Sequence, residues 1–446
     1  MKFVIIGGDA AGMSAASRAK RIDPQLEVVV LEQTMDVSYS ACGMPYNIGD
    51  PQRDIEELVV RRAEVFRSKQ GIDLRTGWRA EGIDPAGGVV SGIDHEGKRF
   101  EQPYDRLLIA TGASAVRPDL PGFDLPGVMV LKSLDQGRRI KNFLQSRRVR
   151  RAVIIGMGYV ALEMCENLRG LGIEVDMVKP RPVFLPWMPE EMSQVVLEEV
   201  HANGARTHPG HEITAIETAA DGLKVQCRDL SLEADMVLVA VGVTPNSQIA
   251  AAAGLDLSVN RAIAVDRSLR TSDEKIFAAG DCADAFHIVS GERVWIPLAL
   301  RANRAGWAVA DNVCGRRTEL DGVAGTAVFK VFGLQVARTG LTVEEARRAG
   351  FDPVAVIIKT RSRAHAHPGS TPIWNHMVAD AGSGRLLGMQ MVGREGVAHR
   401  INAPAVALHA GMTVAQFSQC DLAYAPPFGP TWDPMLTTAN QLLKKL

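Results

Sequence analysis

Cys42 is the residue of this sequence whose surroundings most favour covalent redox chemistry. It lies among small and polar side chains in the segment Ser38–Tyr46, which reads SYSACGMPY. A helix that starts just after Cys42 would lower the pKa of its thiol and make it a better nucleophile. A single reactive sulfur of this kind can hold a mixed disulfide, a persulfide or a sulfenic acid.

The rest of the composition indicates a protein of the reducing cytoplasm. Five further cysteines show neither metal-ligand nor disulfide-framework spacing, and we expect mostly buried free thiols at Cys165, Cys227, Cys282, Cys314 and Cys420. A formal net charge of −1 over 446 residues argues against nucleic acid or a membrane surface as a partner, because both need a basic face. We expect no membrane span and no signal peptide, because no apolar run of 18 residues or cleavage pattern occurs.

The elements that must position Cys42 begin with a strand–turn–helix–strand unit at residues 2–32. An apolar strand, KFVIIGG, ends in a turn with Gly7 and Gly12, and Asp9 takes the place of the middle glycine of G-x-G-x-x-G. Free N–H groups at the start of the following helix suit a pyrophosphate, and Glu32 can accept hydrogen bonds from a ribose. We therefore predict a dinucleotide site here, against the simpler interpretation of an ordinary turn.

The same pattern recurs at residues 151–178. The strand RAVIIG leads into a turn with Gly156 and Gly158, a helix and a second strand. Lys179 stands where an acidic residue would meet a ribose, and Arg181 follows two residues later. Cations there would attract a 2′-phosphate, which favours NADPH over NADH, unless the two are only solvated surface charges.

Three further apolar strands end in turns that suit nucleotide binding. Residues 107–112 end in Thr111-Gly112, residues 237–246 repeat that pattern, and residues 276–281 end in Asp281. A carboxylate at the carboxyl end of a parallel strand lies where ligands bind in doubly wound sheets. The predicted fold class is α/β, with two Rossmann-like dinucleotide-binding domains. One bound and one exchanging cofactor are expected.

Along its whole length the chain resembles the two-dinucleotide-binding flavoprotein disulfide reductases. The resemblance implies an FAD domain of residues 1–112 and 245–320, with Asp281 on the ribityl chain. It implies an NAD(P)H domain of residues 113–244 and a C-terminal α+β dimerisation domain of residues 321–446, hence a homodimer. Glutathione-reductase-like members have a second cysteine where this chain has Asn47, so a disulfide within this motif is excluded.

The cysteine segment most resembles the coenzyme A-disulfide reductase branch, which includes NAD(P)H polysulfide and persulfide reductases. In that branch the single cysteine rests as a mixed disulfide with coenzyme A, and a tyrosine of the partner subunit reaches over it. Tyr424, in YAPPF, matches that tyrosine, whereas His367 replaces a second one and Ala41 replaces an asparagine. His367 could donate a proton or be a plain surface histidine. Ala10 stands where related peroxidases have a histidine, which counts against peroxidase activity.

Coenzyme A carries several phosphates, so its site needs cations. Arg18 and Arg21, one turn apart on the first helix, and Ser38 match branch positions that contact coenzyme A. Solvated helix-face arginines are the plainer alternative.

The resemblance implies transfer of electrons from NAD(P)H through FAD to Cys42, and then to a disulfide, persulfide or polysulfide. An NAD(P)H oxidase that reduces oxygen at the flavin is the alternative enzyme, and a redox-sensing binding module without turnover is a third interpretation. We expect no rhodanese-like domain beyond Leu446.

Overall fold

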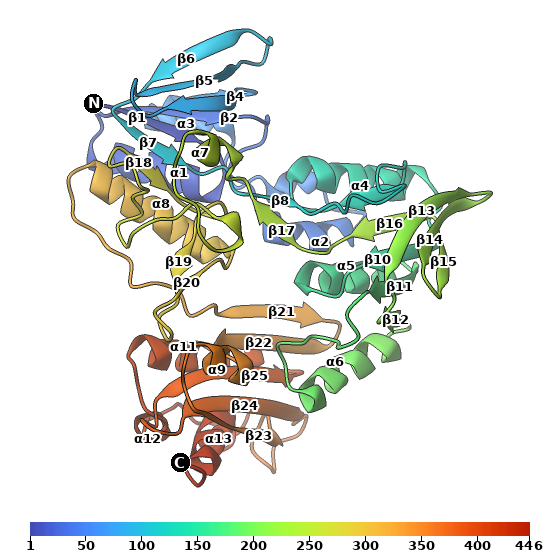
Figure 1. Cartoon of the computed structure of the whole chain (residues 1–446). Helices are drawn as coiled ribbons and strands as arrows, with labels where there is room; N and C mark the ends of the chain where they lie inside the picture. Colours follow the sequence, from blue (N-terminus) through green and yellow to red (C-terminus); the bar gives the residue numbers. More distant parts are fainter.

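The computed structural model describes residues 1–446, and its three bodies are each built on a five-stranded sheet (Figure 1). The first body contains a parallel sheet in the order β18-β7-β1-β2-β3. Its strands are short buried apolar runs, as expected for parallel strands covered on both faces. They are β1 (Lys2–Ile6), β2 (Glu27–Glu32), β3 (Asp73–Thr76), β7 (Arg106–Ile109) and β18 (Ile276–Ala278).

Two long helices cross closely beside this sheet, α1 (Ala10–Ile22) and α8 (Ala299–Val313). Small residues permit the approach, because a β-carbon on Gly306 would lie 2.2 Å from the carbonyl oxygen of Ala11. The body also contains α3 (Ala63–Gln70), α7 (Gln248–Ala252), the hairpin β19 (Ala285–Phe286) and β20 (Arg293–Val294), and an antiparallel sheet of β4 (Arg79–Asp84), β5 (Val89–Ile93) and β6 (Arg99–Pro103).

The second body repeats the design with a parallel sheet in the order β12-β11-β10-β16-β9. Its strands are β9 (Val128–Val130), β10 (Arg151–Ile155), β11 (Glu174–Lys179), β12 (Arg206–Pro209) and β16 (Met236–Val239). The helices are α4 (Leu134–Ser146), α5 (Tyr159–Gly170) and α6 (Glu190–Ala202). An antiparallel sheet contains β13 (Ile213–Ala219), β14 (Gly222–Cys227) and β15 (Ser231–Ala234).

The chain passes between the first two bodies through a two-stranded antiparallel ribbon of β8 (Ala113–Ala115) and β17 (Val243–Pro245). The second body is therefore an insertion in the first. The segment that carries Cys42 lies between them and forms a 3-10 turn (Ala41–Gly43), α2 (Met44–Ile48) and a second 3-10 turn (Ile55–Leu58).

The third body is an antiparallel sheet in the order β21-β22-β25-β24-β23, with helices against it (Figure 1). The strands are β21 (Ala327–Val331), β22 (Leu334–Gly340), β23 (Pro353–Arg361), β24 (Pro372–Asp380) and β25 (Leu386–Gly393). The helices are α9 (Val343–Arg348), α10 (Val397–Arg400), α11 (Asn402–His409), α12 (Val414–Ser418) and α13 (Pro434–Leu442). The predicted fold class, α/β with two Rossmann-like domains and a C-terminal α+β domain, is confirmed. None of the helices has the length and apolarity that crossing a bilayer requires.

Candidate active site

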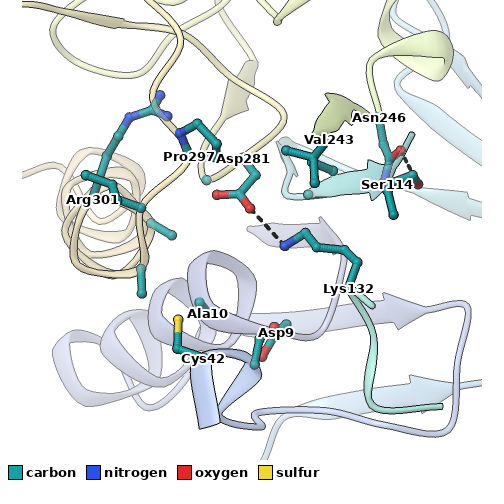
Figure 2. Close-up of a pocket in the computed structure, with 18 of the residues that line it drawn as sticks. Asp9, Ala10, Cys42, Ser114, Lys132, Val243, Asn246, Asp281, Pro297 and Arg301 are labelled. Carbon is teal, nitrogen blue, oxygen red and sulfur yellow. Dashed lines mark hydrogen bonds and ion pairs between the residues drawn. The ribbon is translucent and has the colours of Figure 1, made fainter. Parts of the chain in front are cut away.

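Both glycine turns open onto one cavity of about 2240 Å³, which Cys42 also lines. Small-molecule sites commonly occupy roughly 300–1,000 Å³, so this cavity has room for more than one ligand. Figure 2 shows the Cys42 side chain beside Ala10 and Asp9, across the cavity from Asp281 and Lys132.

The first turn has the close backbone approach that its glycines predict. Gly7 has φ +114°, and a β-carbon there would lie 2.1 Å from the carbonyl oxygen of Ala110. A β-carbon on Gly12 would lie 1.9 Å from the carbonyl oxygen of Gly7. Glu32 ends β2 at the wall of the cavity, where its Oε2 accepts a hydrogen bond from the backbone N–H of Gly8 at 2.7 Å. Burial raises the pKa of Glu32.

Asp9 lies at the N-terminus of α1, where its Oδ1 accepts a hydrogen bond from the backbone N–H of Tyr39 at 3.3 Å. Burial raises the pKa of this carboxyl group to about 6, and the charges of Glu32 and Asp281 act in the same direction. Lys132 opposes them and forms an ion pair with Asp281, with 3.1 Å between Nζ and Oδ2 (Figure 2). Lys132 was not found by sequence reasoning, because it lies 149 residues from its partner in an unremarkable loop.

The second turn has the same geometry as the first. Gly156 has φ +120°, and a β-carbon there would lie 2.2 Å from the carbonyl oxygen of Ala240. Gly158 has open space where a side chain would be, and Thr111 and Gly112 line the same cavity. Neither α1 nor α5 has a side-chain cap at its N-terminus. Their first N–H groups are therefore free for phosphate oxygens, so both turns fit a dinucleotide.

The two cations predicted to select NADPH both line the cavity at the end of β11. Lys179 donates a hydrogen bond from Nζ to the carbonyl oxygen of Val183 at 2.5 Å, and burial and then the charge of Arg181 lower its pKa. Arg181 is exposed and has no ion-pair partner in the chain. Of the two, Arg181 is therefore the cation free to meet a phosphate.

Cys42 is exposed at the cavity wall, in the 3-10 turn that precedes α2. The expectation that the helix start lowers its pKa is wrong for the protein alone. Partial burial of the thiol raises its pKa, and the nearby charge of Glu163 raises it further, whereas Lys132 acts in the opposite direction. Glu163, on α5, accepts a hydrogen bond from the hydroxyl of Tyr46 at 3.0 Å. This carboxylate comes from the second body and gave no local signal in the sequence.

Asn47 occupies a buried position on α2, five residues after Cys42. Its Oδ1 and carbonyl oxygen accept hydrogen bonds from Nζ of Lys141 at 2.8 and 2.9 Å. The position thus anchors the cysteine segment to α4 rather than supplying a second sulfur.

Tyr424 and His367 do not line the cavity of their own chain. Both lie on the third body, on segments joined by a hydrogen bond of 3.1 Å from the N–H of Ala364 to the carbonyl oxygen of Pro426. The Tyr424 side chain is half exposed. Within one chain, Tyr424 and His367 therefore lie on neighbouring segments, and neither lies at the cavity that Cys42 lines.

The three residues predicted to contact coenzyme A differ in their availability. Arg18 forms a bidentate ion pair with Asp311, at 2.9 and 2.8 Å, and lies 5.2 Å from the ring centre of Trp307. Arg21 is exposed and has no such partner. Ser38 has φ +49° and does not line the cavity, so its position bends the chain ahead of the cysteine turn.

All six cysteines are free thiols, as expected. Three of the five outside the cavity are buried, and Cys314 and Cys420 are partly exposed. The buried Cys282 donates from its sulfur to the carbonyl oxygens of Ile109 and Ala279 and plays the expected packing role.

Two glycine turns that fit dinucleotides and share a cavity with one exposed cysteine define a protein that binds two dinucleotides beside a single thiol. The chain belongs to the pyridine nucleotide-disulphide oxidoreductase family, whose model matches residues 1–306, and the dimerisation-domain model of that family matches residues 326–435. The family implies FAD and NAD(P)H. The expected enzyme class, an FAD-dependent pyridine nucleotide-disulfide oxidoreductase similar to coenzyme A-disulfide reductases, is confirmed.

Similar proteins cover nearly the whole chain. A CoA-dependent NAD(P)H sulfur oxidoreductase of Pyrococcus furiosus is 38% identical, over 99% of both chains. An NAD(P)H coenzyme A polysulfide/persulfide reductase of Pyrococcus horikoshii is 36% identical, over 99% of this chain and 98% of its own. The solved structure of an NAD-dependent persulfide reductase from A. fulgidus is 35% identical with a TM-score of 0.96, over 100% of this chain and 83% of its own.

Proposed function

We propose that this protein uses FAD and NADPH to reduce sulfur–sulfur bonds through Cys42, with coenzyme A-linked disulfides, persulfides or polysulfides as substrates. The observation that carries the proposal is that Cys42 is the one cysteine on the cavity that both glycine turns share. Electrons that enter at the second turn therefore have a single thiol within the cavity to reach. The names of the two Pyrococcus relatives support the substrate class.

Bound FAD would supply the chemistry that the side chains lack, which is to accept a hydride from nicotinamide and to pass two electrons to sulfur. The thiolate of Cys42 attacks one sulfur of the substrate, a Cys42–substrate disulfide forms, and the other sulfur leaves and takes up a proton. Two electrons then break the mixed disulfide and restore the Cys42 thiolate. Overall, one NADPH and one proton convert one disulfide into two thiols.

The groups around Cys42 determine how readily its thiol loses a proton to form the thiolate. Burial and the carboxylate of Glu163 raise the pKa of the thiol, and the ammonium of Lys132 acts against them. Attack therefore needs a group that stabilises the thiolate. We assign this role to Tyr424, with His367 beside it, from the partner subunit. Support comes from the half-exposed Tyr424 side chain and from the match to the dimerisation domain.

The cofactor and substrate preferences follow from exposed cations. Arg181 supports NADPH, because it is the unpaired cation at the end of β11. Arg21 is available for a phosphate of coenzyme A, whereas Arg18 would first have to leave Asp311.

The variant Cys42→Ser tests the proposal. Cys314→Ser is the control, because Cys314 is also accessible to solvent but does not line the cavity. We expect C42S to retain FAD and its reduction by NADPH but to lose at least a hundredfold in turnover of coenzyme A disulfide or polysulfide. C314S should keep wild-type turnover. Mass spectrometry of the oxidised wild type should show one coenzyme A that reductant releases and that C42S lacks.

Undiminished disulfide turnover in C42S would contradict the proposed mechanism. Oxygen consumption that survives in C42S and exceeds disulfide reduction in the wild type would instead favour the NAD(P)H oxidase.

A further inference from the structure

Two segments of the third body, residues 361–372 and 420–433, form a single surface unit that we call the arm. The first carries His367, the second carries Tyr424, and the hydrogen bond from Ala364 to Pro426 joins them. Aromatic side chains of the arm point to solvent, since Tyr424, Phe428 and Trp432 are 50%, 79% and 63% exposed. Burial of these rings on their own subunit therefore does little to fix the arm.

An open surface depression of about 330 Å³ borders the second segment of the arm. It is lined by Gly396, His399, Arg400, Leu422, Ala423, Phe428, Asp433 and Met435. Cys420 and Leu422 are the arm residues that pack against the apolar core of the third body. Polar contacts add to this support.

Arg400 makes those polar contacts from α10, with a side chain that is only 12% exposed. Its Nε donates to Oδ2 of Asp433 at 2.8 Å, and one terminal nitrogen donates to the carbonyl oxygen of Phe428 at 2.8 Å. The same nitrogen lies 3.4 Å from the carbonyl oxygen of Ser362. One guanidinium thus contacts both segments of the arm and the residue that caps α13.

Two glycines leave the space that this guanidinium occupies. A β-carbon on Gly396 would lie 2.0 Å from a terminal nitrogen of Arg400, and one on Gly429 would lie 3.0 Å from the other. Gly396 also has φ +76°, which favours glycine. The local chain is therefore shaped around the Arg400 side chain.

We propose that Arg400 is a positioning residue that locks the arm and so presents Tyr424 and His367 to Cys42 of the partner subunit. The inference rests on the proposed function, because it needs the arm to act across the dimer. Arginine suits the role because its planar fork can bind a carboxylate and two carbonyl oxygens at fixed angles, which an ammonium cannot do.

The variant Arg400→Gln tests the inference in the FAD-loaded protein. We expect NADPH to reduce its FAD within twofold of the wild-type rate, and kcat for coenzyme A disulfide or polysulfide to fall at least tenfold. Arg400→Lys should restore part of the loss and provides a second variant if R400Q folds poorly. The double variant R400Q/Y424F should be no slower than the slower single variant, because both changes remove the same positioned hydroxyl. Arg394→Gln is the matched control, because Arg394 bonds to Glu199 on α6 and not to the arm.

Mixed dimers of C42S and R400Q, isolated with two affinity tags, separate action across the dimer from action within a subunit. The R400Q chain supplies an intact Cys42 and the C42S chain an intact arm, so one of the two sites is complete. We expect about half of the wild-type turnover, although each parent homodimer is nearly inactive. No recovery in the mixed dimer, or normal turnover in R400Q, would overturn the inference. Turnover by the C42S homodimer would instead overturn the proposed function.

Discussion

Four charged side chains, Asp9, Glu32, Asp281 and Lys132, interact at one part of the cavity wall, and three of them are acidic. Burial makes the carboxylate form of Asp9 costly, because the single cation is already paired with Asp281. Ionisation of Asp9 should therefore lower the free energy of unfolding.

Replacement of Asp9 by asparagine should stabilise the cofactor-free protein at pH 8. The pKa of Asp9 is about 6 in the folded protein and about 4 in an unfolded chain. Folding therefore takes up a proton between about pH 4 and pH 6, so stability falls as pH rises through that window and stays lower above it. We expect D9N to raise the free energy of unfolding at pH 8 by about 1–3 kcal/mol.

Urea denaturation of both proteins between pH 4 and pH 8 measures this effect. The advantage of D9N should shrink as pH falls from 6 to 4. An advantage that stays constant over the whole range would rule out titration of Asp9 as its source.

Glu163 controls the ionisation of Cys42 from another body of the protein. Its charge raises the pKa of the thiol after burial does. Glu163→Gln should therefore lower the pKa of Cys42 and increase the thiolate fraction at pH 8. We expect iodoacetamide to alkylate Cys42 faster in the cofactor-free E163Q protein than in the wild type, because the thiolate is the reactive form. C42S gives the background from other cysteines, and an unchanged pH–rate profile in E163Q would count against this role.

At the scale of residues, short sequence motifs could be predicted, whereas contacts between residues distant in the chain could not. The glycine turns and Cys42 were found because their neighbours in the chain carry the signal. Lys132 and Glu163 could not be found, because they meet their partners across 149 and 117 residues. Arg18 stays a predicted coenzyme A contact, and its ion pair with Asp311, 293 residues away, could not be found from the sequence.

At the scale of elements, α4 and the loop before it connect the second body to the cysteine segment. Arg138 forms bidentate contacts with Asp36 at 2.7 and 2.7 Å and also with Glu56. A β-carbon on Gly137 would lie 2.9 Å from Ile55 and 3.1 Å from Met44, so α4 packs closely there. Helix α4 thus fixes the turn that bears Cys42 from outside its own body.

Lys141 adds a buried cation to this contact. Its ammonium donates to the carbonyl oxygens of Asn47 and Asp50, each at 2.9 Å, and to that of Arg53. Lys141→Met would remove the donor that these carbonyl oxygens share and would leave the buried Oδ1 of Asn47 without its hydrogen bond. We expect a loss of about 2–4 kcal/mol in the free energy of unfolding by urea. The exposed Lys69→Met is the control and should change stability by less than about 0.5 kcal/mol; an equal effect of both variants would contradict this reading of α4.

At the scale of the whole molecule, the exposed rings of the arm indicate a second copy of the chain as their partner. We expect a native mass of about twice the 48.1 kDa of one chain. Phe428→Asp should weaken the dimer at least tenfold in dissociation constant, because a charge would be buried in the interface. Light scattering on a dilution series measures this. Met35→Asp on the first body is the control, because Met35 is 72% exposed and Phe428 79%. A stable dimer of F428D would place the contact surface elsewhere.

The β8–β17 ribbon has a consequence for modular exchange. Ala113 pairs with Pro245 and Ala115 with Val243, so the chain leaves the first body and returns to it at neighbouring points. Everything between these strands can be treated as a cassette whose two ends are already side by side. Grafting the cassette of a relative at the ribbon would exchange the second nucleotide site and leave the arm unchanged. The graft must keep Lys141 and Glu163, because these two cassette residues bond to the segment that carries Cys42.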